Sequence, residues 1–282
     1  MSTFTIARLT FKEAARRKIL LAAAVLGLLF LTVFGLGYHY IMLNMEDSFG
    51  SSNLLELNEI RNFLLMAGMY VVNFLTAMMT VLTSVDTLSG EISTGTIHTL
   101  VSKPIRRWEI VAGKWLGFAG MITLYLLLMG GGVMSLIYLR SGYVAPNPIQ
   151  ALGLVWLNGL VLLSVSLFGG TFLSTLANGV LVFGLYGIAF IGGWIEQIGS
   201  FLPDLSARQT AINIGIITSL IMPSEALWKR AAHELESSLV AAIGVSPFSS
   251  RTYPSIAMVL YAVFYTAVVL ALAIRQFNRR DL

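Results

Sequence analysis

Long uncharged, apolar runs are the feature of this sequence that most restricts its fold. A helix that crosses the ~30 Å hydrocarbon core of a bilayer needs about 20 residues. Five runs reach that length, and a sixth is shorter and rich in glycine. They cover residues 19–43, 62–85, 110–139, 149–173, 179–195 and 255–274. The sequence therefore predicts an all-α integral membrane protein with six transmembrane helices.

The composition agrees with this class and excludes others. Of the 282 residues, 56% are apolar and 11% are charged, whereas roughly a quarter of the residues of a soluble domain are charged. The absence of cysteine excludes disulfide bonds, thiolate metal sites and cysteine nucleophiles. Arg16, Arg17 and Lys18 precede the first apolar run, as in a signal peptide. That run is long and has no convincing small-residue cleavage site, so a retained membrane anchor is expected.

The positions of lysine and arginine predict the orientation in the membrane, because basic loops stay cytoplasmic. With a cytoplasmic N-terminus, the inner segments hold 12 of the 18 basic residues and five acidic ones, for a net charge of +7. The outer segments hold the other six basic and nine acidic residues, for a net charge of −3. Both termini are therefore expected in the cytoplasm.

Several segments are expected outside the spans. Residues 1–18 mix apolar and basic side chains, which predicts an amphipathic helix on the inner leaflet. A solvated start to the first span is the alternative. On the outer side, residues 200–253 form the largest polar region. Within it, residues 211–222 are too few to cross the membrane and are followed by Pro223, so a re-entrant or interfacial helix is expected.

A second helix is expected later in this outer region. Ser224 is placed to cap it, and apolar residues then recur every three to four positions as far as Ala242. This pattern predicts an amphipathic helix on the outer membrane surface. With residues 211–222 it would form a lid over an exit, or else pack against the spans.

Two glycine pairs have the spacing that allows close packing between membrane helices. They are Gly113 with Gly117 and Gly184 with Gly187. Glycine is common in membrane helices, so the pairs predict contacts without identifying the partner helix.

The segment most informative about function is 86–108, between the second and third spans. Ser93 or Thr94 can cap a short helix, and Pro104 ends that helix at Lys103. A short helix with one apolar edge and a basic exit suits docking into a groove on a cytosolic partner. An ordinary basic loop is the alternative. The apolar residues that share one side are Ile97, Leu100 and Val101.

The order of residues in this segment resembles the first cytoplasmic loop of type-2 ABC transporter permeases. The residues that carry the resemblance are Glu91, Gly95, Thr96, Ile97, Leu100, Lys103, Pro104, Arg107 and Lys114. The resemblance covers nearly the whole chain, from a basic N-terminal elbow helix through six spans and an external re-entrant element to the tail at 276–282. Within the family, the chain resembles the single-polypeptide permeases of nitrous-oxide-reductase maturation and of multidrug or sodium export.

The resemblance implies one transmembrane permease domain over residues 1–282, acting as an exporter in a prokaryotic cell (inner) membrane. Two copies of the chain would form the pore, and two cytosolic ATPase subunits would dock on segment 86–108, its coupling helix. Glu91 would make a polar contact with the ATPase, and Ile97 and Leu100 apolar ones. A second coupling turn is expected between the fourth and fifth spans, at Ser174, Thr175 and Asn178.

The chain lacks the loop with which ATPases hold phosphate. Gly113 and Lys114 are adjacent, but no glycine precedes them at the required spacing. Trp115 stands where a Ser or Thr would hold magnesium. We therefore expect a transport subunit that is not itself an enzyme and binds no cofactor. ATP and magnesium would belong to the partner ATPase.

A polar stripe in the second span is the candidate lining of a translocation path. Such residues also bond between helices or to their own backbone carbonyls, which is the alternative. No charged residue lies in the middle of a span, where it would cost roughly 2.5–3.5 kcal/mol. A transporter driven by an ion gradient is therefore disfavoured. The stripe consists of Asn73, Thr76, Thr80 and Thr83.

No metal site is predicted. The histidines, His39, His98 and His233, are far apart in the sequence. Met66, Met69, Met78 and Met79 offer thioethers that copper(I) accepts, but methionines in so apolar a chain are interpreted as packing residues.

The cargo is not determined by the sequence. Membrane lipids and a periplasmic or extracellular protein are further expected partners, and nucleic acid is not. An intramembrane enzyme and a structural anchor of a larger complex are the alternative functions. Neither accounts for the basic, proline-ended segment 86–108.

Overall fold

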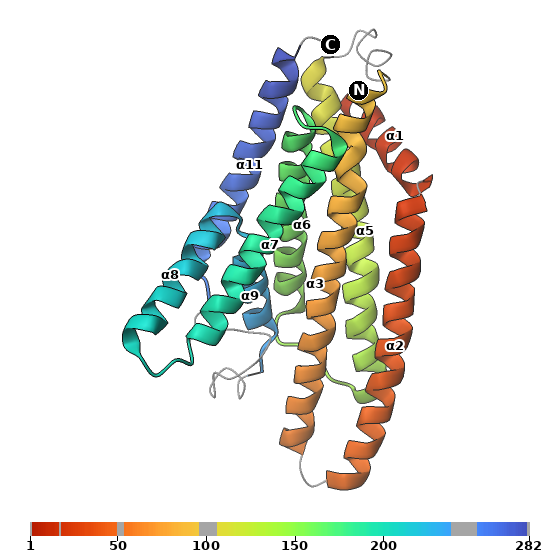
Figure 1. The fold of residues 1–282 in the computed structure, drawn as a ribbon. Helices are drawn as coiled ribbons and strands as arrows, with labels where there is room; N and C mark the ends of the chain where they lie inside the picture. The colour runs from red at the N-terminus through yellow and green to blue at the C-terminus, as the bar shows by residue number, and fades with distance from the viewer. Residues whose placement is uncertain (1, 17, 50–53, 96–105, 238–252, 281–282) are drawn as a thin grey trace.

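A computed structural model describes residues 2–16, 18–49, 54–95, 106–237 and 253–280. In these ranges the regular structure is entirely helical. Both ends of the chain lie at one end of the helix bundle, which we call the terminal end, and the opposite end is the distal end (Figure 1). The helices are α1 (Ser2–Arg16), α2 (Lys18–Phe49), α3 (Leu54–Ser93), α5 (Arg107–Ser141), α6 (Pro148–Gly170), α7 (Thr175–Gly199), α8 (Leu205–Ile221), α9 (Ser224–Leu235) and α11 (Ile256–Arg279).

Six of these helices are long and apolar enough to cross a membrane, which confirms the expected fold class. They are α2, α3, α5, α6, α7 and α11. The spans at 62–85 and 179–195 are parts of longer helices, α3 with 40 residues and α7 with 25. Residues 86–93, expected in a connection, continue α3. Hydroxyl groups of this stretch donate to carbonyls of the preceding turn, as Ser89 does to Val85.

The core of the bundle is built around α6 and α3. Two thirds of the apolar stretch of each of these helices is buried, compared with 6% in α2 and 17% in α11. Helix α6 packs against α3, α5, α7, α9 and α11. Its side chains Leu162, Leu163 and Leu167 are completely buried. Helices α2 and α11 therefore leave most of their apolar surface for lipid or another protein.

The first helix, α1, crosses the terminal end of α5, and the two glycines at 113 and 117 make this approach possible (Figure 1). A Cβ atom at Gly113 would lie 2.7 Å from the Ile6 side chain. A Cβ atom at Gly117 would lie 2.7 Å from the Ala7 carbonyl oxygen. Real Cβ contacts are longer, so only glycine fits at both positions. The other pair, Gly184 and Gly187, faces open space in the single chain.

Helices α8 and α9 form a hairpin bent by 108°, in which α8 lies along α7 at the outside of the bundle and α9 enters its distal half (Figure 1). The bend follows Ile221, because Pro223 cannot continue α8. Where the structure describes residues 224–242, the expected position on the membrane surface is wrong, and the alternative, packing against the spans, is confirmed. Helix α9 is buried among α3, α6 and α7, and even its Lys229 is only 3% exposed. Ser224 is likewise not the N-cap: Pro223 holds that position, and the Ser224 hydroxyl is buried without a hydrogen-bond partner.

Candidate functional site

At the terminal end, Glu91 of α3 and Lys114 of α5 form a buried ion pair. Lys114 Nζ lies 2.5 Å from Glu91 Oε1, and the two side chains are 4% and 15% exposed. Two opposite charges withdrawn from water attract strongly, but each is costly to bury alone. The pair therefore fixes the end of α3 relative to α5.

The connection between α6 and α7 is tied to the same end of α3. The Thr175 hydroxyl donates to the Asp86 carboxylate (3.0 Å) and lies 3.0 Å from the Ser89 hydroxyl. Asn178 is completely buried, and its Nδ2 donates to the carbonyls of Val85 (3.1 Å) and Ser166 (2.9 Å). Both connections in which the sequence predicts coupling residues therefore meet at one helix end.

The last helix also reaches this region. The Arg107 guanidinium, at the start of α5, donates to the Arg280 carbonyl (2.5 Å) and to the Asn278 carbonyl (3.4 Å). The Arg280 side chain in turn donates to the Thr171 carbonyl, beside the α6–α7 connection. Arg280 thus joins the end of α11 to α5 through its carbonyl and to the end of α6 through its side chain.

Several predicted coupling residues lie outside the described part of the chain, so their role stays a prediction. They are Thr96, Ile97, Leu100, Lys103 and Pro104. Gly95 has φ +72°, a left-handed conformation that favours glycine and ends α3. The Ser93 and Thr94 hydroxyl groups donate to the Gly90 carbonyl at 2.9 and 2.8 Å. These two residues therefore complete α3. The short helix that they were expected to cap falls on residues 96–103, which lie outside the described residues.

The polar stripe of α3 is buried inside the chain. Asn73, Thr76, Thr80 and Thr83 are each at most 5% exposed. Thr80 and Thr83 donate to carbonyls one turn earlier, and Asn158 of α6 donates to Asn73 Oδ1 at 3.0 Å. The Asn158–Asn73 bond joins two helices, whereas Thr80 and Thr83 bond within their own helix. A role as the lining of a path stays a prediction.

The sequence reasoning missed a charged cluster near the distal end, formed by Glu196 of α7 with Glu225 and Lys229 of α9. Lys229 Nζ lies 2.6 Å from Glu196 Oε2. Lys229 and Glu225 are 3% and 8% exposed. The sequence signal was the pair of opposite charges four residues apart at 225 and 229, on one face of a helix. This pair was not identified as a buried site from the sequence, because a helix on the membrane surface was expected there.

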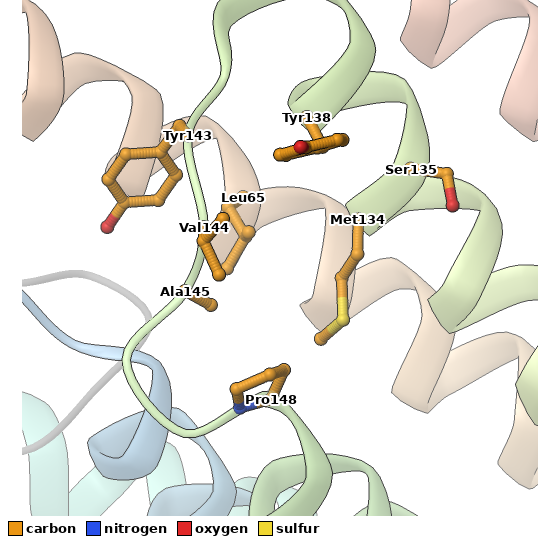
Figure 2. A pocket seen from close by; sticks show the side chains of 8 residues that line it. All are labelled: Leu65, Met134, Ser135, Tyr138, Tyr143, Val144, Ala145 and Pro148. Carbon is orange, nitrogen blue, oxygen red and sulfur yellow. The ribbon is translucent and has the colours of Figure 1, made fainter.

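A cavity of about 260 Å³ lies where α5, α3 and the α5–α6 connection meet at the distal end (Figure 2). Its walls are mostly apolar, with Leu65, Met134 and Pro148 among them, and Tyr138 and Tyr143 add the aromatic surface. The walls hold no acid or base suited to catalysis at neutral pH.

Within the described residues, no three histidine, aspartate or glutamate side chains gather closely enough to hold a metal ion. His39 accepts a hydrogen bond from Arg140, and His233 stacks on Tyr253. Met66, Met69 and Met79 are packed in the core and Met78 beside it. His98 lies outside the described residues.

Six helices long and apolar enough to cross a membrane, joined by the bent pair α8–α9, define a multi-pass membrane protein. The family described as ABC-2 family transporter protein matches residues 4–282. The chain therefore belongs to this family and is the membrane component, or permease, of a type-2 ABC transporter. No curated protein matches the chain. The narrower resemblance to maturation and multidrug or sodium export permeases stays an expectation.

Proposed function

We propose that the chain works as a dimer energised by two cytosolic ATPase subunits that dock at its terminal end. The docking surfaces are segment 86–108 and the α6–α7 connection around residues 174–178. The observation that carries this proposal is the hydrogen bonding of Thr175 to Asp86 and its 3.0 Å contact with Ser89, which join the two surfaces. A movement imposed on either surface therefore acts on the same end of α3.

Helix α3 can transmit that movement to the distal end, since 40 helical residues extend about 60 Å. At its far end, Asn62 is completely buried. Its Nδ2 donates to the Leu235 carbonyl at the end of α9 (2.7 Å) and to Tyr143 Oη (2.9 Å). We infer that closure of the ATPase subunits shifts α3 and, through Asn62, the re-entrant hairpin, and so alternates access to the pore from the two sides.

Cysteine protection tests the docking surfaces in this cysteine-free chain. Thr94 and Leu176 are exposed at the terminal end, and Pro203 is exposed at the distal end. Single cysteines at these positions are labelled with a maleimide in the chain alone and in the chain purified with its ATPase. Protection at 94 and 176, with unchanged labelling at 203, supports docking at the terminal end. Equal labelling with and without the ATPase contradicts it.

The same variants test the orientation. In sealed inverted vesicles, a membrane-impermeant maleimide should label Leu176→Cys from the cytoplasmic side and leave Pro203→Cys unlabelled until the vesicles are opened. The reverse pattern would contradict cytoplasmic termini.

The open faces of α2 and α7 support association of two copies. Most of the apolar surface of α2 is exposed, and α7 presents Gly184 and Gly187, where a Cβ atom would meet no neighbour within 4 Å. A second helix can approach closely there. Gly184→Cys should form a disulfide-linked dimer on mild oxidation in membranes. Leu124→Cys on α5, also exposed to lipid, is the control and should remain monomeric. Equal crosslinking at both positions would indicate random collision.

A further inference from the structure

The charged cluster of Glu196, Glu225 and Lys229 borders a cavity that the proposed coupling mechanism does not use. The cavity encloses about 410 Å³ between α7, α8, α9 and the start of α11. Glu196 and Lys229 form its charged wall, and Ile212, Ile216 and Met258 line its apolar part. It thus joins a buried ion pair to an apolar space of the size of a small amphiphile.

The backbone around both carboxylates is shaped to accommodate them. A Cβ atom at Gly215 of α8 would overlap the Glu196 carboxylate, and one at Gly193 of α7 would overlap the Glu225 side chain. Any side chain at Gly193 or Gly215 would therefore fill the space that one of these carboxylates occupies. The two glycines are what allow these acids to lie between packed helices.

Burial raises the pKa of the Glu225 carboxyl to about 7, so at pH values above this the cluster holds one more negative charge than Lys229 can pair. Lys229 pairs with Glu196, although Glu225 lies one turn before it on α9, a spacing at which Glu and Lys also attract. Helix α6, residues 209–221 of α8 and residues 256–274 of α11 contain no charged residue. Arg230, the next cation on α9, pairs with Glu234 at 2.9 Å and lies over the Tyr253 ring. A buried charge without a partner is costly, so the cluster favours one more cation.

We propose that this cavity binds an amphiphilic ammonium compound, whose charged group pairs with Glu196 while its apolar part lies along Ile212, Ile216 and Met258. Lys229 then turns to Glu225 on its own helix, so that two carboxylates face two ammonium groups. That the bound ammonium compound is also transported rests on the proposed function. That the cavity binds it does not.

Photolabelling tests the binding. The full chain, purified in an uncharged maltoside detergent without ATPase, is exposed to decylamine that carries a diazirine. Decanol with the same diazirine is the matched probe without charge. We expect the amine to label the cavity-lining residues of α8 and α11 at least about tenfold more than the alcohol, a ratio that corresponds to about 1.4 kcal/mol. Equal labelling by both probes would overturn the proposal, since the cavity would then recognise only the apolar part.

Three variants identify the groups responsible. Glu196→Gln should lower amine labelling at least about tenfold, and Glu225→Gln should also lower it, because the surplus negative charge is gone. Met258→Trp should lower it by filling the cavity without changing any charge. Glu109→Gln removes a carboxylate at the start of α5, at the terminal end of the bundle and outside the cavity, and labelling should not change. Wild-type labelling of Glu196→Gln overturns the site, and wild-type labelling of Glu225→Gln overturns the charge argument, since a proton would then neutralise that carboxyl.

The outcome is distinguishable from that of the proposed function. Loss of ATPase protection at Thr94 and Leu176 with normal amine labelling would contradict only the docking proposal. Normal protection with no amine labelling would contradict only the cation site.

Discussion

Lys114 and Glu91 are joined by an ion pair of 2.5 Å that is nearly closed to solvent. From the sequence, Glu91 was expected to contact an ATPase subunit. Its Oε1 instead accepts a hydrogen bond from the same chain. The pair ties Glu91, which is part of segment 86–108, to α5 and makes the position of its charge depend on that helix. Glu91 can therefore affect coupling by positioning α3, in addition to any contact with a partner.

Glu91→Ala is expected to destabilise the protein, because Lys114 is left buried without its partner, a change that costs about 3–5 kcal/mol in comparable pairs. Thermal unfolding in detergent, followed by tryptophan fluorescence, measures the loss. The double variant Glu91→Ala with Lys114→Met should recover most of the stability and still transport poorly per ATP hydrolysed. Full coupling in the stable double variant would show that the pair has a structural role only.

Gly117→Ala should weaken the packing of α1 on α5, because the new Cβ atom would lie 2.7 Å from the Ala7 carbonyl oxygen. Overpacking of this kind costs about 1–3 kcal/mol. Trypsin should then cleave more rapidly at Arg8 and Lys12 of α1. Gly120→Ala is the matched control on the same helix, since its nearest neighbour would be Phe11 at 3.9 Å. Equal cleavage of the two variants would contradict the close approach.

Thr175→Val should separate the α6–α7 connection from α3. It removes a hydrogen bond to the Asp86 carboxylate, and bonds to charged groups contribute about 1.5–3 kcal/mol. We expect a lower unfolding temperature and fewer transport events per ATP hydrolysed in reconstituted vesicles. Thr210→Val is the control, because that hydroxyl donates to Ser206 within α8. If both variants couple normally, the link between the two surfaces has no part in transport.

Asn62→Ala should loosen the end of α9 from α3. The Leu235 carbonyl and the Ser237 amide would each lose the partner that Asn62 supplies, at a cost of about 1–3 kcal/mol for a buried polar group. Hydrogen exchange of the peptides that contain residues 224–237 should become faster. The exposed amide of Asn213, which accepts from Gln209 on α8, provides the control variant Asn213→Ala, with no change expected.

The phenol of Tyr143 makes the same network sensitive to high pH. Burial raises the pKa of Tyr143 above its ordinary value of 10.0, an effect that the hydrogen bond from Asn62 opposes and nearby Glu59 and Tyr38 reinforce. A group with a raised pKa in the folded state stabilises the fold below pH 10 and loses that contribution as the pH rises through the higher value. Tyr143→Phe should therefore reduce the fall in unfolding temperature above pH 10. An unchanged pH profile would exclude this phenol as its source.

The sequence alone predicted the features that depend on local composition. The six spans follow from apolar runs whose length matches a bilayer, and residues 211–222 were too few to cross it. The glycines at 113 and 117 indicated close packing, and the order of residues from Glu91 to Lys114 indicated the family. These signals lie in short stretches of the chain, so no tertiary contact was needed to detect them.

The tertiary structure decided which polar groups meet. Glu196 lies 33 residues from Lys229, and no periodicity within α7 or α9 relates them. Their pairing arises because the α8–α9 hairpin folds back into the bundle, and Gly193 and Gly215 leave room for the two carboxylates. Helix α9 looks amphipathic in sequence, but its charged face turns toward α7 instead of water. Charged residues at the ends of spans are solvated locally, so the sequence alone indicates where a span ends. A buried charged cluster forms only when helices distant in the sequence pack together and exclude water, so it depends on the tertiary structure.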